Sequence, residues 1–504
     1  MKILLLNPPN RAIGSRIPKE KLPPLGLLYI GGSLIDIGYK DIELLNADYF
    51  NMSDKKILQK VKSYQPDVLL IGHSGSTSAH PIAMRLTSQI KSLLSHIKIV
   101  YGGVYPSYHA YEILRDEPSI DFIVQGEGEA IIQELVRGVE IEKYNEIKGI
   151  AYRENGSIKI APPAPIIQDL DLYRVGWELI DIADYSYWGD KRAVMVQFSR
   201  GCPHKCSYCG QREFWERWRH RDPVKFAKEL ARLRREEGVE VFNFADENPT
   251  TNKKVWRLFL ETLIAENIEV SLVASTRTDD IIRDADILHL YRKAGFERFL
   301  LGIENYNEST LEKIKKGTTV QTDREAIKLL RANGILSMAT YVFGFEEERV
   351  SDYWGGLKKI ISYDPDQIQM LYATPHRWTN YFHEVKHREV IQPNLEKWDY
   401  KHQIMATNNV SPLILFISVK MMELILQLRP KAINRYFFHP DPKIKHAIRW
   451  YYKMGRRVWF HEVYNFFFDD KRLKKGKLLA EFWNFVSVKG RDRRDYEKAK
   501  RESY

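Results

Sequence analysis

Six short runs rich in β-branched and aromatic residues, separated by amphipathic stretches, constrain the fold of this chain more than any other feature. The intervening stretches carry helix signals, since Asp222 precedes Pro223 at one expected helix start and Gly334 follows another expected helix end. Such repeated alternation predicts an α/β fold with a parallel sheet, curled as a partial (β/α)6 barrel of the TIM type. The runs cover residues 193–199, 239–246, 270–276, 298–304, 336–345 and 367–374.

A second alternation occupies the first ~140 residues, with apolar runs at residues 2–6, 67–72, 98–101 and 121–124. These runs lead into turns rich in glycine and small polar residues, at residues 72–78, 102–107 and 126–129. The pattern predicts a Rossmann-like, doubly wound domain whose ligand lies beyond the carboxyl ends of the strands. No G-x-G-x-x-G follows the first run, which disfavours a nicotinamide dinucleotide.

The length of 504 residues fits about three domains. We expect a Rossmann-like domain over residues 1–140, a linker over 141–190, the partial barrel over 191–380 and a mostly α-helical, basic domain over 381–504. The first apolar run is too short for a signal peptide. The apolar stretch 413–428 contains Lys420 and Glu423 and is shorter than a membrane span. A soluble, cytoplasmic protein is therefore expected.

Charge is concentrated at the carboxyl end of the chain. Residues 401–504 carry 23 Lys or Arg against 10 Asp or Glu, whereas the formal net charge of the whole chain is +11. A basic region of this kind can contact nucleic acid, an anionic membrane surface or an acidic substrate, or can be a solvated face. We expect no nucleic-acid partner, and peripheral membrane contact stays open.

All three cysteines of the chain, Cys202, Cys206 and Cys209, fall within eight residues. An odd number so closely spaced excludes a disulfide framework and indicates a reducing compartment. The C-x3-C-x2-C spacing suits three thiolate ligands of a [4Fe–4S] cluster, with the fourth iron open to a non-protein ligand. A structural zinc site that includes His204 is the alternative. The loop follows the first barrel strand, at the edge where barrel active sites lie.

This cysteine loop, with Tyr208 before its third cysteine, resembles that of the radical SAM superfamily. The resemblance implies that Cys202, Cys206 and Cys209 hold the cluster. It also implies that the open iron binds S-adenosylmethionine (SAM), and that reductive cleavage of SAM yields a 5′-deoxyadenosyl radical. For Asp246 and Glu247, the acidic pair that ends the second predicted barrel strand, a surface turn is the alternative. SAM contacts are implied for Tyr208, Asp246, Glu247, Ser275, Arg277, Gly302 and Glu304, with glycine allowing the backbone to approach the adenosyl group.

The Gly-Gly-x-x-Pro-Ser and Gly-Glu-Gly-Glu turns resemble the cobalamin-binding domain that precedes many radical SAM barrels. The D-x-H-x-x-G motif is absent, so the resemblance implies bound cobalamin without a protein histidine below the cobalt. His73, His80 and His109 are predicted to be polar turn residues. Cobalamin contacts are implied for Ser74, Ser76, Gly102, Gly103, Tyr105, Ser107, Gly126 and Glu127.

From about Cys202 to Trp483, the chain resembles the family of anaerobic magnesium-protoporphyrin IX monomethyl ester cyclases of (bacterio)chlorophyll synthesis. The stretches that carry this resemblance are residues 215–223, 363–369, 374–379, 397–402 and 454–459. The resemblance implies oxygen-independent oxidative closure of the isocyclic ring of a tetrapyrrole. Oxygen would come from water, and an external donor such as flavodoxin or ferredoxin would supply electrons.

A planar, anionic macrocycle would be recognised by flat apolar faces and by forked cationic donors. The substrate candidates are Trp215, Arg217, His376, Arg377 and Trp378. Each of them can instead be an ordinary core or surface residue. Two other functions stay open: a cobalamin-dependent radical SAM methyltransferase or paralogue with another tetrapyrrole or hydrophobic substrate, and a non-catalytic tetrapyrrole or cobalamin sensor.

Overall fold

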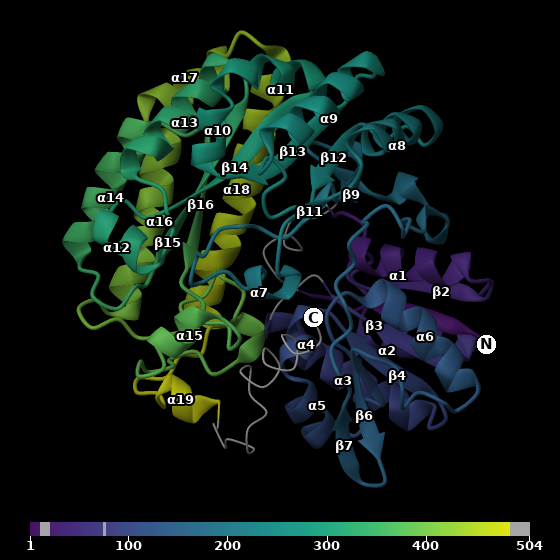
Figure 1. The fold of residues 1–504 in the computed structure, drawn as a ribbon. Helices are drawn as coiled ribbons and strands as arrows, with labels where there is room; N and C mark the ends of the chain where they lie inside the picture. The colour runs from purple at the N-terminus through teal and green to yellow at the C-terminus, as the bar shows by residue number, and fades with distance from the viewer. Residues whose placement is uncertain (11–20, 74–76, 484–504) are drawn as a thin grey trace.

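The computed structural model describes residues 1–10, 21–73 and 77–483. Two seven-stranded sheets dominate it, one in the N-terminal part and one in the middle of the chain. Figure 1 shows them side by side, with the purple and blue N-terminal domain against the teal and green barrel. The predicted α/β class, with a Rossmann-like domain and a partial barrel, is confirmed.

The N-terminal sheet has the strand order β2-β1-β3-β4-β5-β6-β7. Its first five strands are parallel: β1 (Ile3–Asn7), β2 (Ile42–Asn46), β3 (Val68–Ile71), β4 (Lys98–Gly102) and β5 (Phe122–Val124). Helices cover both faces, as expected for strands with continuous apolar runs. They are α1 (Leu25–Asp36), α2 (Asp54–Tyr64), α3 (His80–Leu93), α4 (Val104–Tyr108), α5 (Ala110–Asp116) and α6 (Gly128–Glu140).

The segment expected to be a linker contains two more strands of this sheet. β6 (Ile150–Glu154) pairs antiparallel with β5, and β7 (Ser157–Ile160) pairs antiparallel with β6. These two strands are hard to predict from the sequence because β7 is largely exposed and both strands are short. The N-terminal sheet therefore extends past residue 140, into the expected linker.

The second sheet has the order β16-β15-β14-β13-β12-β9-β8 and does not close, which makes it a partial barrel. Its six parallel strands overlap the six predicted runs. They are β9 (Lys191–Val196), β12 (Val241–Phe244), β13 (Ser271–Thr276), β14 (Phe296–Glu304), β15 (Leu336–Phe343) and β16 (Gln367–Tyr372), and β8 (Ser186–Tyr187) adds an antiparallel edge.

Helices pack on the outer face of this sheet around one large apolar core. The side chain of Asp222 accepts hydrogen bonds from the amides of Val224 and Lys225, which confirms the predicted cap of α8. These helices are α8 (Pro223–Glu236), α9 (Lys253–Ala265), α10 (Thr278–Arg283), α11 (Leu288–Ala294), α12 (Glu308–Lys313), α13 (Val320–Ala332) and α14 (Val350–Tyr363).

The C-terminal part is mostly helical, as predicted. It comprises α15 (Asn380–Glu384), α16 (Pro412–Leu428), α17 (Pro430–Phe438), α18 (Pro442–Phe468) and α19 (Leu479–Phe482). The first half of α18 packs on Val241 of β12, Val273 of β13 and Leu336 of β15. Across the described residues, no helix is both long and apolar enough to span a membrane.

Candidate active site

The three cysteines lie on the loop between β10 (Ser199–Arg200) and α7 (Arg212–Trp215), beyond the carboxyl end of β9. All three are free and partly exposed. The backbone of Ser207 holds the loop, since its amide donates to the carbonyl of Ile314 (3.0 Å) and its carbonyl accepts from the amide of Tyr381 (2.9 Å). The indole of Trp378 donates to the carbonyl of Gly210 (2.7 Å). The cysteine loop is thus bound to segments that follow the last barrel strands.

The donor set of this loop fits a [4Fe–4S] cluster. Burial raises the pKa of the Cys209 thiol to about 11, so thiolate formation there needs a bound cation. Three thiol ligands on one loop are what a [4Fe–4S] cluster with one open iron requires.

Two buried cations stand beside the cysteines. Burial lowers the pKa of Lys316, but the nearby Glu304 and Cys206 raise it by more. The pKa of Lys316 is therefore above its usual value. The pKa of Arg277 is also raised, because the effects of Asp279, Cys206 and Cys202 outweigh the effect of burial. Both side chains therefore stay charged and offset the negative charge that a thiolate-bound cluster would bring. Sequence reasoning missed Lys316, which lies in the loop after α12 and outside every motif.

The acidic pair after β12 divides into two roles. The carboxylate of Asp246 turns back toward the end of β9, where it accepts from the amides of Phe198 (3.0 Å) and Ser199 (2.5 Å) and from the Ser199 hydroxyl (2.6 Å). In this structure Asp246 thus fixes the strand that leads to the cysteine loop, and its predicted contact with SAM stays a prediction. Burial raises its pKa to about 7.

Glu247 is the member of the pair that faces the cysteine loop. It accepts from the indole of Trp215 (2.8 Å) and from the amide of Gly201 (3.3 Å), one residue before Cys202. Burial raises its pKa to about 7, and the nearby Asp246 adds to the rise. A carboxylate in this position could bind an ammonium group, which would restore its charge. Its predicted contact with SAM stays a proposal.

The ends of β13 and β14 differ in part from the prediction. Ser275 is half-buried, and the guanidinium of Arg277 donates to Asp279 (2.9 Å) and to the carbonyl of Lys316 (3.0 Å). A Cβ atom on Gly302 would come within 2.5 Å of both Glu304 Oε1 and Lys316 Nζ. A side chain at this position would therefore displace the ends of the Glu304 and Lys316 side chains, and the predicted approach of the adenosyl group to Gly302 stays a prediction.

Glu304 is the centre of a buried polar cluster. Its backbone has φ of +64°, at a register shift where β14 pairs with β15. Its Oε1 atom accepts from the Tyr208 hydroxyl (2.9 Å) and pairs with Lys316 (3.2 Å). A strained, bulged strand end thus aims a carboxylate at the residue between the last two cysteines, a pattern typical of functional sites.

The N-terminal domain presents its glycine turns to the same region. Gly103 has φ of +114° and Gly126 has φ of +85°, both of which favour glycine. The Ser107 hydroxyl joins the two turns, because it donates to the carbonyl of Gly103 (2.7 Å) and accepts from the amide of Gly126 (2.9 Å). Among the described residues, a Cβ on Gly102 would meet only Val124, at 3.7 Å. The described part of the chain therefore leaves room at Gly102 for a ligand to approach the backbone. Ser74 and Ser76 lie outside the described residues.

Glu127 does not face these turns. Its carboxylate pairs with Arg200 (2.8 Å) and Arg219 (2.7 Å) and accepts from the amide of Ile167 (2.7 Å), while Glu129 pairs with Arg200 (2.5 Å). All four charged side chains are at most 6% exposed. The Glu127 side chain thus belongs to a buried ion-pair cluster that joins the N-terminal domain to the barrel, and the predicted contact of Glu127 with cobalamin stays a prediction.

Three of the predicted substrate residues lie between the two domains, where His376 and Trp378 are buried and Arg377 is partly exposed. Trp378 is 2% exposed and stacks on Tyr108, with ring centroids 5.6 Å apart. His376 contacts Thr77 through Nδ1 (3.0 Å) and Tyr400 through Nε2 (2.6 Å), and burial lowers its pKa to about 3. Arg377 pairs with Glu112 (2.8 Å). In this structure the three side chains make contacts between the domains, and their predicted role toward the substrate stays a prediction.

The other two candidates lie nearer solvent. Trp215 is half-buried above Glu247, and the guanidinium of Arg200 lies 5.1 Å from its ring. Arg217 is exposed and donates to Gln168 (2.7 Å). Their role toward a substrate stays a prediction.

An aromatic column connects the N-terminal turns to the cysteine loop. Tyr105 stacks on His80 (4.4 Å between centroids) and contacts His109 (4.3 Å), which in turn lies 5.8 Å from Trp378. The buried imidazole of His109 lies between Tyr105 and Trp378 in this column. The open backbone at Gly102 fits a ligand between the two domains. Sequence reasoning treated His109 as a polar turn residue.

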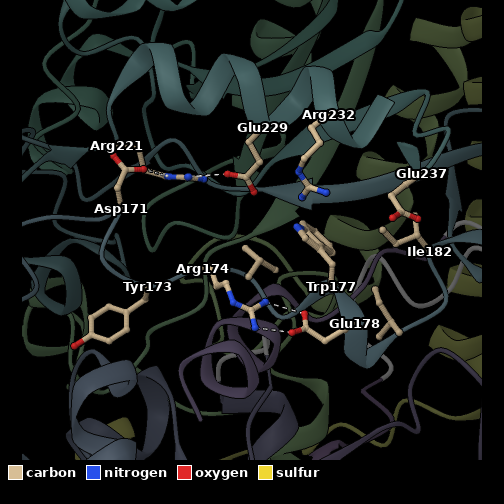
Figure 2. A pocket seen from close by; sticks show the side chains of 12 residues that line it. Asp171, Tyr173, Arg174, Trp177, Glu178, Ile182, Arg221, Glu229, Arg232 and Glu237 are labelled. Carbon is tan, nitrogen blue, oxygen red and sulfur yellow. Dashed lines mark hydrogen bonds and ion pairs between the residues drawn. The ribbon is translucent and has the colours of Figure 1, made fainter. Parts of the chain in front are cut away.

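A separate cleft of about 580 Å³ lies between residues 171–182 and α8. Figure 2 shows that five of its charged side chains pair with each other: Arg221 bridges Asp171 and Glu229, and Arg174 pairs with Glu178. None of the predicted site residues lines it. The cleft is therefore distinct from the site around the cysteines.

Comparison with known proteins agrees with this arrangement. Residues 196–352 match the model of the radical SAM superfamily, and residues 17–136 match the model of the B12 binding domain. The structure of the radical SAM methyltransferase TsrM from Kitasatospora setae aligns with a TM-score of 0.69, covering 92% of this chain and 99% of that one at 15% identity. The cobalamin-dependent radical enzyme OxsB aligns with a TM-score of 0.68 at 17% identity. At these identities, the two structures establish the fold alone.

The fold and both matched models define a radical SAM protein with a cobalamin-binding domain. Its predicted cofactors, a [4Fe–4S] cluster, SAM and cobalamin, are confirmed at the level of these families. The chain is 56% identical over 484 residues to the anaerobic magnesium-protoporphyrin IX monomethyl ester cyclase of Synechocystis sp., which covers 96% of this chain and 97% of the relative. The cyclase of Rubrivivax gelatinosus is 32% identical over 411 residues, covering 80% and 73%. The chain belongs to the family of anaerobic magnesium-protoporphyrin IX monomethyl ester cyclases.

Proposed function

We propose that this chain catalyses the oxygen-independent oxidative closure of the isocyclic ring of magnesium-protoporphyrin IX monomethyl ester. The observation that carries the proposal is the 56% identity to a named cyclase over 96% of the chain. That match includes the C-terminal third, which a shared pair of cofactor domains would not require. The ring closure belongs to (bacterio)chlorophyll synthesis.

The cysteine loop and the ends of the barrel strands form the reaction centre of this proposal. Bound there, a [4Fe–4S] cluster and SAM supply a 5′-deoxyadenosyl radical. Cys202, Cys206 and Cys209 hold the cluster, Lys316 and Arg277 balance its charge, and Glu247 accepts the ammonium of SAM. Glu304, which is held by Tyr208 and Lys316, lines the site beside the cysteine loop.

The N-terminal turns hold cobalamin opposite that centre. Gly102, Gly103 and Gly126 leave their backbone open to a corrinoid, and Ser107 keeps the two turns in register. The aromatic column from Tyr105 to Trp378 would form the protein wall between these turns and the cysteine loop. Trp215 and Arg217 are the remaining candidates for contact with the tetrapyrrole. The indole of Trp215 would stack on the macrocycle, and the guanidinium of Arg217 would bind a carboxylate of the substrate. An external donor such as flavodoxin or ferredoxin delivers the electron.

The location follows from the cysteines. Three free thiols, partly exposed, need a reducing compartment to stay available for iron. We therefore propose that the protein acts in the cytoplasm.

Anaerobic incubation of the reconstituted protein with the magnesium porphyrin ester, a reductant and methyl-labelled SAM tests the proposal. We expect a product with a fifth ring, formation of 5′-deoxyadenosine and no label in the pigment. Label in the pigment would instead identify a methyltransferase, the function of the TsrM structure. Cys206→Ala is the matched control, because it removes a cluster ligand and should abolish turnover.

A further inference from the structure

The two longest C-terminal helices expose an apolar surface that no part of the proposed reaction uses. On α16, six apolar residues are at least 41% exposed, and from Ile414 onward they recur every three or four residues along one face. They are Leu413, Ile414, Ile417, Met421, Leu424 and Leu428. This stripe covers the whole length of a helix of 17 residues.

The stripe is free of charge because the charged side chains of α16 turn away from it. Lys420 and Glu423 pair with each other (2.7 Å), and Lys420 also pairs with Glu462 of α18. Their side chains are 7% and 12% exposed. The ion pairs therefore lie between α16 and α18, and the outer face is left wholly apolar.

α18 continues this surface. The two helices run side by side and antiparallel, since Phe416 stacks on Phe466 with centroids 3.8 Å apart and Tyr452 donates to the carbonyl of Gln427. Figure 1 shows them next to each other on the flank of the barrel. Both helices bury the opposite side in the core, so their exposed sides share one face. The end of α18 adds exposed aromatic rings at Phe460, Tyr464, Phe467 and Phe468, each at least 57% exposed.

Basic residues lie on both sides of these rings along the chain. Arg456 and Arg457 precede them on α18, and Lys471, Lys474 and Lys475 follow them, all exposed. An apolar face rich in Leu, Ile and Phe and flanked by Lys and Arg is the composition of helices that lie in a membrane interface. Exposed apolar surface of this extent is uncommon unless it contacts a partner.

We propose that the exposed faces of α16 and α18 dock on the surface of an anionic lipid bilayer, with the apolar stripe and aromatic rings entering the headgroup region. The charge pattern favours a bilayer over a second copy of the chain, because two copies meeting at this face would bring their basic residues together. Neither helix needs to span the membrane, in keeping with their composition. The inference does not depend on the proposed function.

Vesicle sedimentation of the full-length reconstituted protein tests this. Neutral phosphatidylcholine vesicles are compared with vesicles that also contain phosphatidylglycerol, at low and high salt. We expect stronger binding to the anionic vesicles, weakened by salt. The paired change Phe467→Ser with Phe468→Ser should lower the partition at least about tenfold. The paired change Arg456→Gln with Arg457→Gln should lower it about fivefold per charge on anionic vesicles only.

Matched controls use equally exposed residues elsewhere. Ile141→Ser with Leu172→Ser removes two side chains that are 64% and 66% exposed, and Lys55→Gln with Lys56→Gln removes two exposed charges. Neither control should change binding. Absence of vesicle binding, or equal losses in the controls, would overturn the proposal. A concentration-dependent dimer that the Phe467 and Phe468 changes abolish, without vesicle binding, would show that a second copy covers this face.

Discussion

Replacing Glu127 by Gln should destabilise the contact between the two domains strongly. The carboxylate is 2% exposed and balances Arg200 and Arg219, so its loss leaves one buried positive charge uncompensated. Breaking a buried ion pair from one side costs about 3–5 kcal/mol of unfolding free energy. Arg200 keeps Glu129, and Arg219 keeps the carbonyls of Ile167 and Trp215. The expected loss is therefore at the lower end, about 3 kcal/mol.

Urea unfolding of the apoprotein measures this loss, and a second variant isolates its cause. In the double change Glu127→Gln with Arg219→Met, one buried cation disappears with the anion. The loss of unfolding free energy in the double variant should then be smaller than the sum of the losses in the two single variants, by at least ~1 kcal/mol. A loss below ~1 kcal/mol for Glu127→Gln, or simple additivity, would refute the reasoning. Corrinoid affinity of the folded Glu127→Gln protein should stay near that of the wild type, and a selective loss of affinity would instead support the predicted contact of Glu127 with cobalamin.

Three further predictions concern the site. Trp378→Ala should cost about 3–5 kcal/mol in thermal or urea unfolding, as for a buried aromatic residue, with porphyrin affinity of the folded fraction unchanged. Because burial raises the pKa of Asp246 from 3.8 to about 7, the folded apoprotein holds a proton there that the unfolded chain releases. Its unfolding free energy should therefore fall as the pH rises through that range, and Asp246→Asn should lessen the slope by up to ~1.4 kcal/mol per pH unit. Cys202→Ala, Cys206→Ala and Cys209→Ala should each lower bound iron and abolish reductive SAM cleavage while the protein stays folded, and unchanged iron content in any of them would count against the cluster.

The strands of both sheets could be predicted because most are buried on both faces and leave continuous apolar runs. The cysteine loop could be predicted because its chemistry lies within eight residues. β2 was missed: its first three residues are half-buried at the edge of the sheet, and its apolar signal is correspondingly weak. Apolar runs in the sequence thus predict the strands that are buried on both faces, but not the partly exposed strands at the sheet edges.

The direction of individual side chains could not be predicted in the same way. Asp246 and Glu247 are neighbours in the chain, yet one fixes the end of β9 and the other faces the cysteine loop. His376 meets Thr77 across 299 positions of sequence, so no local pattern reports that contact. Lys316 carries no motif, and only the folded chain places it beside Glu304 and Cys206.

The source of the new oxygen atom tests the central claim most directly. The reconstituted protein is supplied with the magnesium porphyrin ester, SAM and a reductant in oxygen-free water enriched in a heavy oxygen isotope. The account predicts that the ring-closed product carries the heavy isotope in its new keto group. A product without the isotope, or ring closure that occurs only after dioxygen is admitted, would contradict an oxygen-independent cyclase.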